Sequence, residues 1–133
     1  QQLIVGGMQG LWAFDLIAGE VSNPKKILNT PIDGLGKDCS GNIYATTTRE
    51  LASRSDGQVV VIIDKNHNEL GQLNVEGIHI VTNVAFGGED GKRLFVTGLT
   101  DLMDEGSPRQ CGAASCLEAG IYTAQLNVQG FPF

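Results

Sequence analysis

The sequence predicts an all-β fold of the β-propeller class, to which this chain contributes about three blades. Two stretches about 50 positions apart, residues 30–35 and 81–85, resemble each other, and each leads through a polar turn into a second apolar strand. The second strands are 51 positions apart, so we expect one extra residue in the second turn. Short apolar runs end at Gly, Asn or Asp, and no segment keeps a 3.6-residue period. Repeats of this length that contain only strands are typical of propeller blades.

Apolar runs and turn residues divide the chain into an incomplete blade at about 1–29, a complete one at about 30–76 and an incomplete one at about 77–133. Strands of the first blade are expected at 3–5, 11–16 and near 26–28. Strands of the complete blade are expected at 34–37, 43–46, 58–63 and 69–75. Strands of the third blade are expected at 82–86, 94–97 and 120–126, with a long insertion at 98–119.

About three blades cannot close a propeller ring. Such an array leaves a sheet face bare at each end, and terminal repeats of this kind need caps or partners. We therefore expect the chain to associate with the N-terminal half of a propeller, or with a second copy of itself. The sequence starts at Gln1 without an initiator Met, which fits a processed or truncated product.

Composition excludes two classes of partner. The 133 residues carry a net charge of −6 and no cluster of Lys and Arg, so nucleic acid is not expected as a partner. No apolar run approaches the ~20 residues of a membrane span, so we expect a soluble protein without a membrane partner. The three cysteines do not fix the compartment, and secretion stays open.

Asp33 is the first candidate for a functional residue. It begins an inner strand, and the first residues of inner strands point into the mouth of a propeller channel. A carboxylate there suits Ca²⁺, Mg²⁺, Mn²⁺ or Zn²⁺. The alternative is that Asp33 caps its own turn. Asn83 is expected at the equivalent place in the next blade, where it would contact substrate or metal-bound water, or else hydrogen-bond to its own turn.

Four further residues are expected on the same face as Asp33. His79 is in the crossover between the second and third blades, and a surface role is its alternative. Arg109 lies in the insertion, where it could hold a polar substrate or pair with a nearby acidic residue. Cys111 and Cys116 are close enough in sequence for a small disulfide ring in an oxidising compartment.

Several motifs, in order along the whole chain, resemble the C-terminal half of the gluconolactonase/senescence marker protein (regucalcin) family. They are Pro31-Ile32-Asp33-Gly34-Leu35, Asp38-Cys39-Ser40-Gly41-Asn42-Ile43-Tyr44, Thr82-Asn83-Val84-Ala85-Phe86-Gly87-Gly88 with Leu94-Phe95-Val96-Thr97, and Ala119-Gly120-Ile121-Tyr122 with Val128-Gln129-Gly130. The resemblance implies a six-bladed propeller that holds one divalent cation in its channel and hydrolyses sugar-type or related lactones.

The same resemblance implies that Asp33 is a metal ligand and a catalytic residue. The other protein ligands of the family would lie upstream of Gln1. The leading hypothesis is therefore a metal-dependent lactone hydrolase, with this chain as its C-terminal half. The alternative is a propeller that binds a ligand or a protein partner without chemistry, because a fold does not by itself carry a function.

Overall fold

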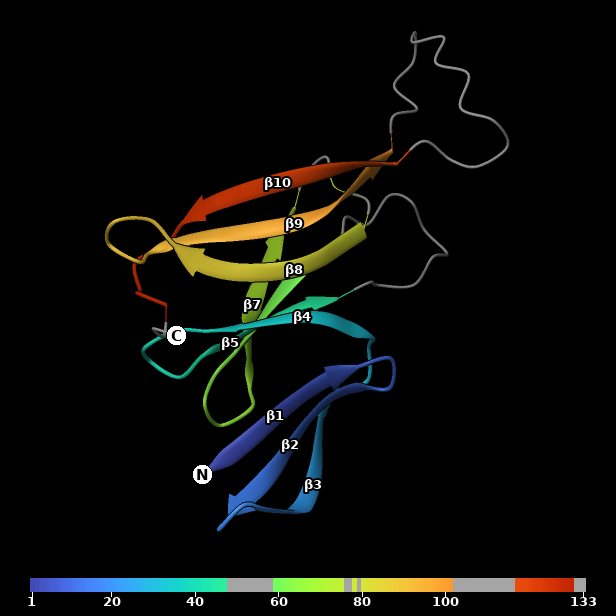
Figure 1. Ribbon diagram of the computed structural model, residues 1–133, viewed down its shortest axis with the longest axis vertical. Helices are drawn as coiled ribbons and strands as arrows, with labels where there is room; N and C mark the ends of the chain where they lie inside the picture. The colour runs from blue at the N-terminus through green and yellow to red at the C-terminus, as the bar shows by residue number, and fades with distance from the viewer. Residues whose placement is uncertain (48–58, 76–77, 79, 102–116, 131–133) are drawn as a thin grey trace, which may run out of the picture.

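The computed structural model describes residues 1–47, 59–75, 78, 80–101 and 117–130. These residues form ten strands in three antiparallel sheets and no helix, so the predicted all-β propeller class is confirmed. Figure 1 shows the three sheets side by side, with the four-stranded sheet between the other two. The central position of that sheet explains why its two middle strands, residues 43–47 and 59–63, are buried on both faces.

Each sheet follows the order of the sequence. The first contains β1 (Gln2–Gly7), β2 (Gly10–Ile17) and β3 (Glu20–Leu28). The central sheet contains β4 (Ile32–Lys37), β5 (Ile43–Thr47), β6 (Val59–Ile63) and β7 (Glu69–Asn74). The third contains β8 (Ile80–Gly87), β9 (Arg93–Asp101) and β10 (Leu117–Gln125).

The last hairpin is longer than the sequence predicted. The ladder between β9 and β10 runs out to Asp101 paired with Leu117, so both ends of the expected insertion at 98–119 are strand. The sequence predicted a strand end at Gly98, but this residue lies inside β9, where there is no room for a side chain. A Cβ there would lie 2.3 Å from the Ile78 side chain and 2.3 Å from the Ile80 carbonyl oxygen. Residues 102–116 of the insertion lie outside the described part of the chain.

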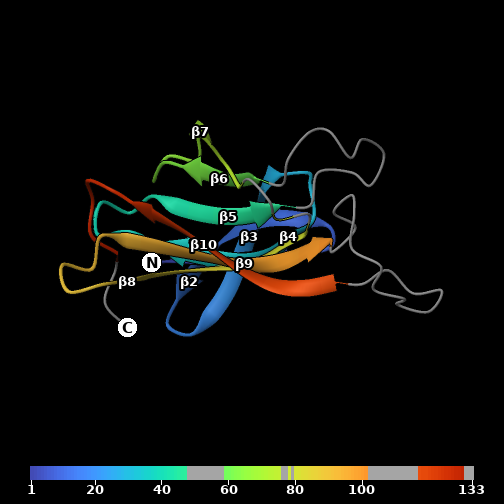
Figure 2. The same cartoon turned by 90° about the horizontal axis from the view of Figure 1, so that it is seen from above.

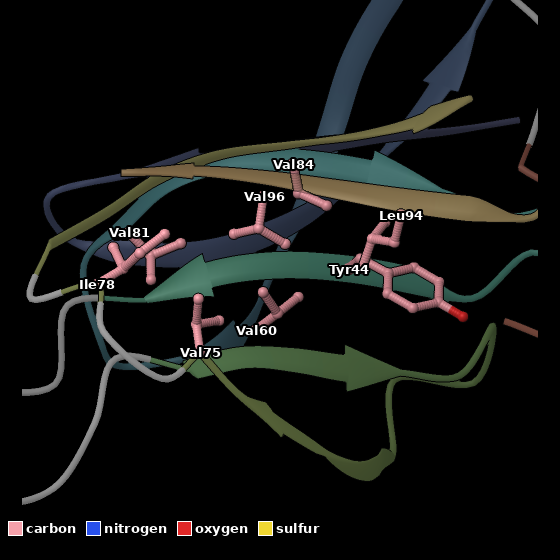
Figure 3. Close-up of a cluster of buried hydrophobic side chains, with 8 residues drawn as sticks. All are labelled: Tyr44, Val60, Val75, Ile78, Val81, Val84, Leu94 and Val96. Atoms are coloured by element: carbon pink, nitrogen blue, oxygen red, sulfur yellow. The ribbon is translucent and has the colours of Figure 1, made fainter. Parts of the chain in front are cut away.

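Two apolar clusters hold the three sheets together. Between the central and third sheets, the side chains of Val84, Leu94 and Val96 face those of Tyr44 and Val60 (Figure 3). Between the first and central sheets, a second cluster of buried residues contains Leu11, Ile32, Ile43, Ala45, Val59, Val61 and Ile63. Strand β6 contributes alternate residues to both clusters, as the sequence predicted for a strand covered on both faces.

The first sheet corresponds to the second, third and fourth strands of the central one. Gly6 of β1 contacts Ile32 of β4, the inner strand of the next sheet. In the same way, Thr46 of β5 contacts β8, the inner strand of the sheet that follows. The partners of these residues across the ladder, Leu11 and Val60, are both fully buried. Strand β1 therefore matches β5, and β10 matches β6. Within the described residues, no inner strand pairs with β1 and no outer strand with β10.

The end of the described chain returns to the central sheet. The Cys39 N–H donates to the Gln129 carbonyl at 2.8 Å, and Gly130 N–H donates to the Gly91 carbonyl at 2.9 Å. Both views place this segment at the same end of the molecule as the turns after β4 and β8 (Figures 1 and 2). The opposite ends of β4 and β8, where these strands begin, carry the candidate site.

Candidate metal and substrate site

The two inner strands, β4 and β8, each contain a β-bulge near their start. In β4, Ile32 pairs with Thr47 and Leu35 with Ala45, so residues 33 and 34 together stand opposite Thr46. In β8, a register shift between Val81 and Asn83 places residues 82 and 83 opposite Thr97. An extra residue in one strand bends that strand and redirects a side chain, which is why bulges are frequent beside active sites.

The bulge explains the exposure of Asp33. Its neighbours Ile32 and Gly34 are both buried. Ile32 faces the first sheet, where it meets Gly6, and Gly34 faces the third sheet, where it meets Asn83. Asp33 is covered by neither sheet and is exposed at the unpaired edge of β4. The innermost edge is the edge that lines the channel of a propeller, so the carboxylate is placed where a bound cation could reach it.

The Asp33 carboxylate, which lies in a strand, differs in its hydrogen bonding from the carboxylates of the turns. Those of Asp38, Asp64 and Asp90 each accept backbone N–H bonds of 2.8 to 3.0 Å within their own turns. The pKa of the Asp64 carboxyl group is lowered first by the side-chain bond from Asn68 and then by the backbone N–H of Asn68, and the pKa of Asp90 is lowered first by the backbone N–H of Lys92. Among the described residues, no hydrogen bond or ion pair engages the Asp33 carboxylate. Its oxygens are therefore available to a ligand.

Asn83, on the neighbouring strand, lies against Gly34, the residue that follows Asp33. A Cβ on Gly34 would come within 2.4 Å of the Asn83 side-chain oxygen and 2.5 Å of the Asn83 Cα, so the two bulges are in close contact. That oxygen accepts the backbone N–H of Val84 at 2.8 Å, a bond within its own strand. The side chain is exposed.

The ladders correct the predicted equivalence of Asp33 and Asn83. Leu35 pairs with Ala45 as Val84 pairs with Val96, so the inner strands are offset by 49 positions and the second strands by 51. By this alignment Thr82 corresponds to Asp33, and Asn83 to Gly34. The expected extra residue in the second turn is wrong: the turns at 38–42 and 88–92 have equal length, and the hairpin of the third sheet is longer by the pair of Gly87 with Arg93.

Three threonines lie in or opposite the two bulges, and they were not among the predicted site residues. The hydroxyl oxygens of Thr82 and Thr97 are 3.1 Å apart. Thr46, fully buried, hydrogen-bonds to the backbone of both bulges. One feature of the sequence could have indicated two of them: a Thr follows an apolar residue in both second strands, as Ala45-Thr46 and Val96-Thr97, at the predicted offset of 51.

Four predicted site residues lie outside the described part of the chain: His79, Arg109, Cys111 and Cys116. Their predicted roles remain predictions. Where the chain is described, no three His, Cys, Asp or Glu side chains gather as a group that could hold a metal ion. Of the predicted site residues, the described part of the chain contains Asp33 and Asn83, both exposed and near the starts of β4 and β8.

Other polar groups of the structure maintain turns rather than the site. The carboxylate of Asp38 is fully buried and accepts hydrogen bonds from Ser40, Asn42 and the Tyr44 hydroxyl. Burial, together with the charge of Asp38, raises the pKa of Tyr44 to about 12. His67 contacts Gln2 through Nε2 at 3.3 Å, and its pKa is lowered, first by burial.

The architecture defines the class of protein. Three antiparallel sheets stacked face to face, with inner strands whose first residues meet at one end, are consecutive blades of a β-propeller. The model of one family, described as the SMP-30/gluconolactonase/LRE-like region, matches residues 8–100. The chain belongs to this family, and the resemblance inferred from its motifs is confirmed. A comparison with curated protein sequences found no match.

Two solved structures share the fold. A luciferin-regenerating enzyme superposes with a TM-score of 0.66 at 23% identity, over 98% of this chain and 42% of that one. A calcium-binding protein, regucalcin from Agrobacterium tumefaciens strain C58, superposes with a TM-score of 0.55 at 22% identity, over 74% of this chain and 33% of that one. This chain therefore spans less than half the length of either structure.

The described residues form strands and the turns between them. In that part of the chain, no helix has the length and apolar character needed to span a membrane.

Proposed function

We propose that the chain forms part of a metal-dependent hydrolase for a sugar-type or related lactone, in which Asp33 is a ligand of one divalent cation. The observation that carries the proposal is the Asp33 carboxylate itself. It is exposed at the inner edge of a bulged strand, and no described group bonds to it. Membership of the SMP-30/gluconolactonase/LRE-like family supports the lactone as substrate class.

The donor set fits a divalent cation that accepts oxygen ligands, namely Ca²⁺, Mg²⁺, Mn²⁺ or Zn²⁺. Asp33 offers an anionic oxygen, and Asn83 offers an exposed amide on the neighbouring strand, against Gly34. When bound, such an ion polarises a carbonyl group and lowers the pKa of a coordinated water. The chain's own contribution is to hold the carboxylate at the channel edge and to present Thr82, Asn83 and Thr97 as hydrogen-bonding groups for a hydroxylated substrate.

One carboxylate is too few ligands for a cation that takes six to eight oxygen atoms or a near-octahedral shell. The remaining ligands would come from the blades that complete the ring. The unpaired edges of β1 and β10 support this assembly, since a sheet edge with free N–H and C=O groups readily pairs with another strand. The N-terminal half of the propeller is the partner we propose, and a second copy of the chain is the alternative.

The test is calorimetric titration of the assembled propeller, meaning the chain together with the blades that complete it. Asp33→Asn keeps the shape of the side chain and removes its charge. Affinity for Ca²⁺, Mn²⁺ or Zn²⁺ should fall by more than about tenfold, because changes outside the ligand set already cost about 10- to 100-fold. Hydrolysis of a sugar lactone should fall in parallel.

Asp90→Asn is the matched control. It removes the same charge from an exposed turn that follows β8, at the far end of the inner strands. Affinity should be unchanged in this variant. Equal affinity of wild type and Asp33→Asn for these cations would refute the proposed metal site, whatever the control shows. Retained metal binding without lactone hydrolysis would favour a binding module.

A further inference from the structure

Thr46 occupies a position from which it reaches both bulges. The N–H of Gly34 donates to its hydroxyl oxygen at 2.7 Å. The same oxygen lies 3.2 Å from the carbonyl oxygen of Gly34 and 3.2 Å from that of Thr82, to either of which the hydroxyl can donate. The side chain is fully buried, so water does not compete for these bonds.

The bond to Gly34 acts on Asp33 through the chain. The N–H of Gly34 belongs to the peptide group that joins Asp33 to Gly34. Fixing the plane of this peptide fixes the backbone immediately after the Asp33 Cα, and with it the direction in which the carboxylate leaves the strand. In a bulge the ladder is locally interrupted, so the backbone lacks the regular partners that would otherwise set this direction.

The contact with Thr82 joins the two blades at the same point. Thr82 and Asn83 form the bulge of the neighbouring inner strand, and Asn83 touches Gly34 directly. One hydroxyl group therefore fixes the bulge that carries the carboxylate and holds it against the bulge that carries the amide. Buried hydrogen bonds of this kind orient the groups that contact a metal ion.

We propose that Thr46 is a positioning residue that sets the direction of the Asp33 carboxylate and its spacing from Asn83. The proposal rests on the proposed role of Asp33 as a cation ligand. Thr46 itself touches neither ion nor substrate. It acts through the peptide after Asp33 and through the carbonyl of Thr82.

Three variants of β5 separate positioning from general stability. Thr46→Val has nearly the same shape as Thr46 without the hydroxyl, and Thr46→Ser keeps the hydroxyl without the methyl. Thr47→Val makes the same change at the next residue, which is also buried. Because side chains alternate along a strand, Thr47 faces the first blade rather than the bulges.

Mn²⁺ titration of the assembled propeller is the main measurement, with Asp33→Asn in parallel. Thr46→Val should weaken Mn²⁺ binding by about 10- to 100-fold. Thr46→Ser should restore most of the affinity, and Thr47→Val should match wild type even if it lowers the melting temperature. Wild-type affinity in Thr46→Val, in a propeller that loses Mn²⁺ on Asp33→Asn, would overturn the inference and leave the metal site standing. No effect of Asp33→Asn would instead refute the site itself.

A second measurement needs no variant to fold. Amide hydrogen exchange of the wild-type chain, read by NMR, should show Gly34 N–H exchanging as slowly as the ladder amides of β5, although Gly34 lies within a bulge. Exchange of Gly34 at the rate of the exposed turn amides would overturn the inference, because the bond to Thr46 would then be absent in solution.

Discussion

Replacing Gly34 with Ala tests the close approach of the two inner strands. The added Cβ would lie 2.4 Å from the Asn83 side-chain oxygen, 2.5 Å from the Asn83 Cα and 2.8 Å from the Thr82 carbonyl oxygen. Two of these atoms belong to the backbone and cannot rotate away, so β4 and β8 must separate. Overpacking of this kind costs about 1–3 kcal/mol of unfolding free energy.

Gly36→Ala is the matched control, two residues further along the same strand and on the same face. A Cβ there would meet Val84 at 3.6 to 3.8 Å, which is ordinary contact. A Gly to Ala change that fits its site stabilises by about 0.4–1 kcal/mol, since it restricts the unfolded chain. Hence Gly34→Ala should be less stable than Gly36→Ala by about 1.5–4 kcal/mol.

Urea unfolding followed by circular dichroism measures both variants against wild type in the same buffer. The slope with urea should be equal in the three proteins, so that the midpoints report stability alone. Equal stability of Gly34→Ala and Gly36→Ala would refute the close contact of the bulges. Metal affinity should also fall in Gly34→Ala and stay unchanged in Gly36→Ala.

Three further predictions concern other parts of the molecule. Leu94→Ala, which truncates a fully buried side chain between blades, should cost about 2–5 kcal/mol in thermal or urea unfolding. Ile121 is 72% exposed on β10, so Ile121→Lys should not lower the stability of the chain itself but should weaken its association with the completing blades in sedimentation experiments; unchanged association would contradict a partner on this face. Because burial lowers the pKa of His67 in the folded chain, the unfolded chain binds more protons just below about pH 6.5. The free energy of unfolding should therefore decrease as the pH is lowered through this range. His67→Asn tolerates the same positive φ of 72° and should flatten that part of the pH profile.

The strands of the central blade could be predicted from the sequence because local signals agree there. The run Val59-Val60-Val61-Ile62-Ile63 is apolar throughout, and turn residues flank it, so the predicted strand at 58–63 contains the whole of β6. The inner strand at Asp33 was predicted two residues short. A Pro and a Gly surround that start, and both usually mark turns.

The bulges could not be predicted from the sequence because they depend on contacts between blades. Counting 50 positions from Asp33 leads to Asn83, and only the pairing of Val84 with Val96 shows that the true offset is 49. An inserted residue in a strand leaves no compositional mark, since its effect is on the register. The role of Thr46 was hidden for the same reason: its partners, Gly34 and Thr82, are set by the contact of two sheets.

Residues 126–130 close a long loop of the chain. The thiol of Cys39 lies 3.1 Å from the carbonyl oxygen of Gly130, which is 91 positions away in sequence. Contacts between such distant residues form late, because the entropy of closing the loop is lost before the contact stabilises the chain. Docking of this segment should therefore be among the last steps of folding. Because docking brings the Gly130 carbonyl group against the Cys39 thiol, labelling of Cys39 by a thiol reagent should slow at that step, and the loss of labelling during refolding would time it.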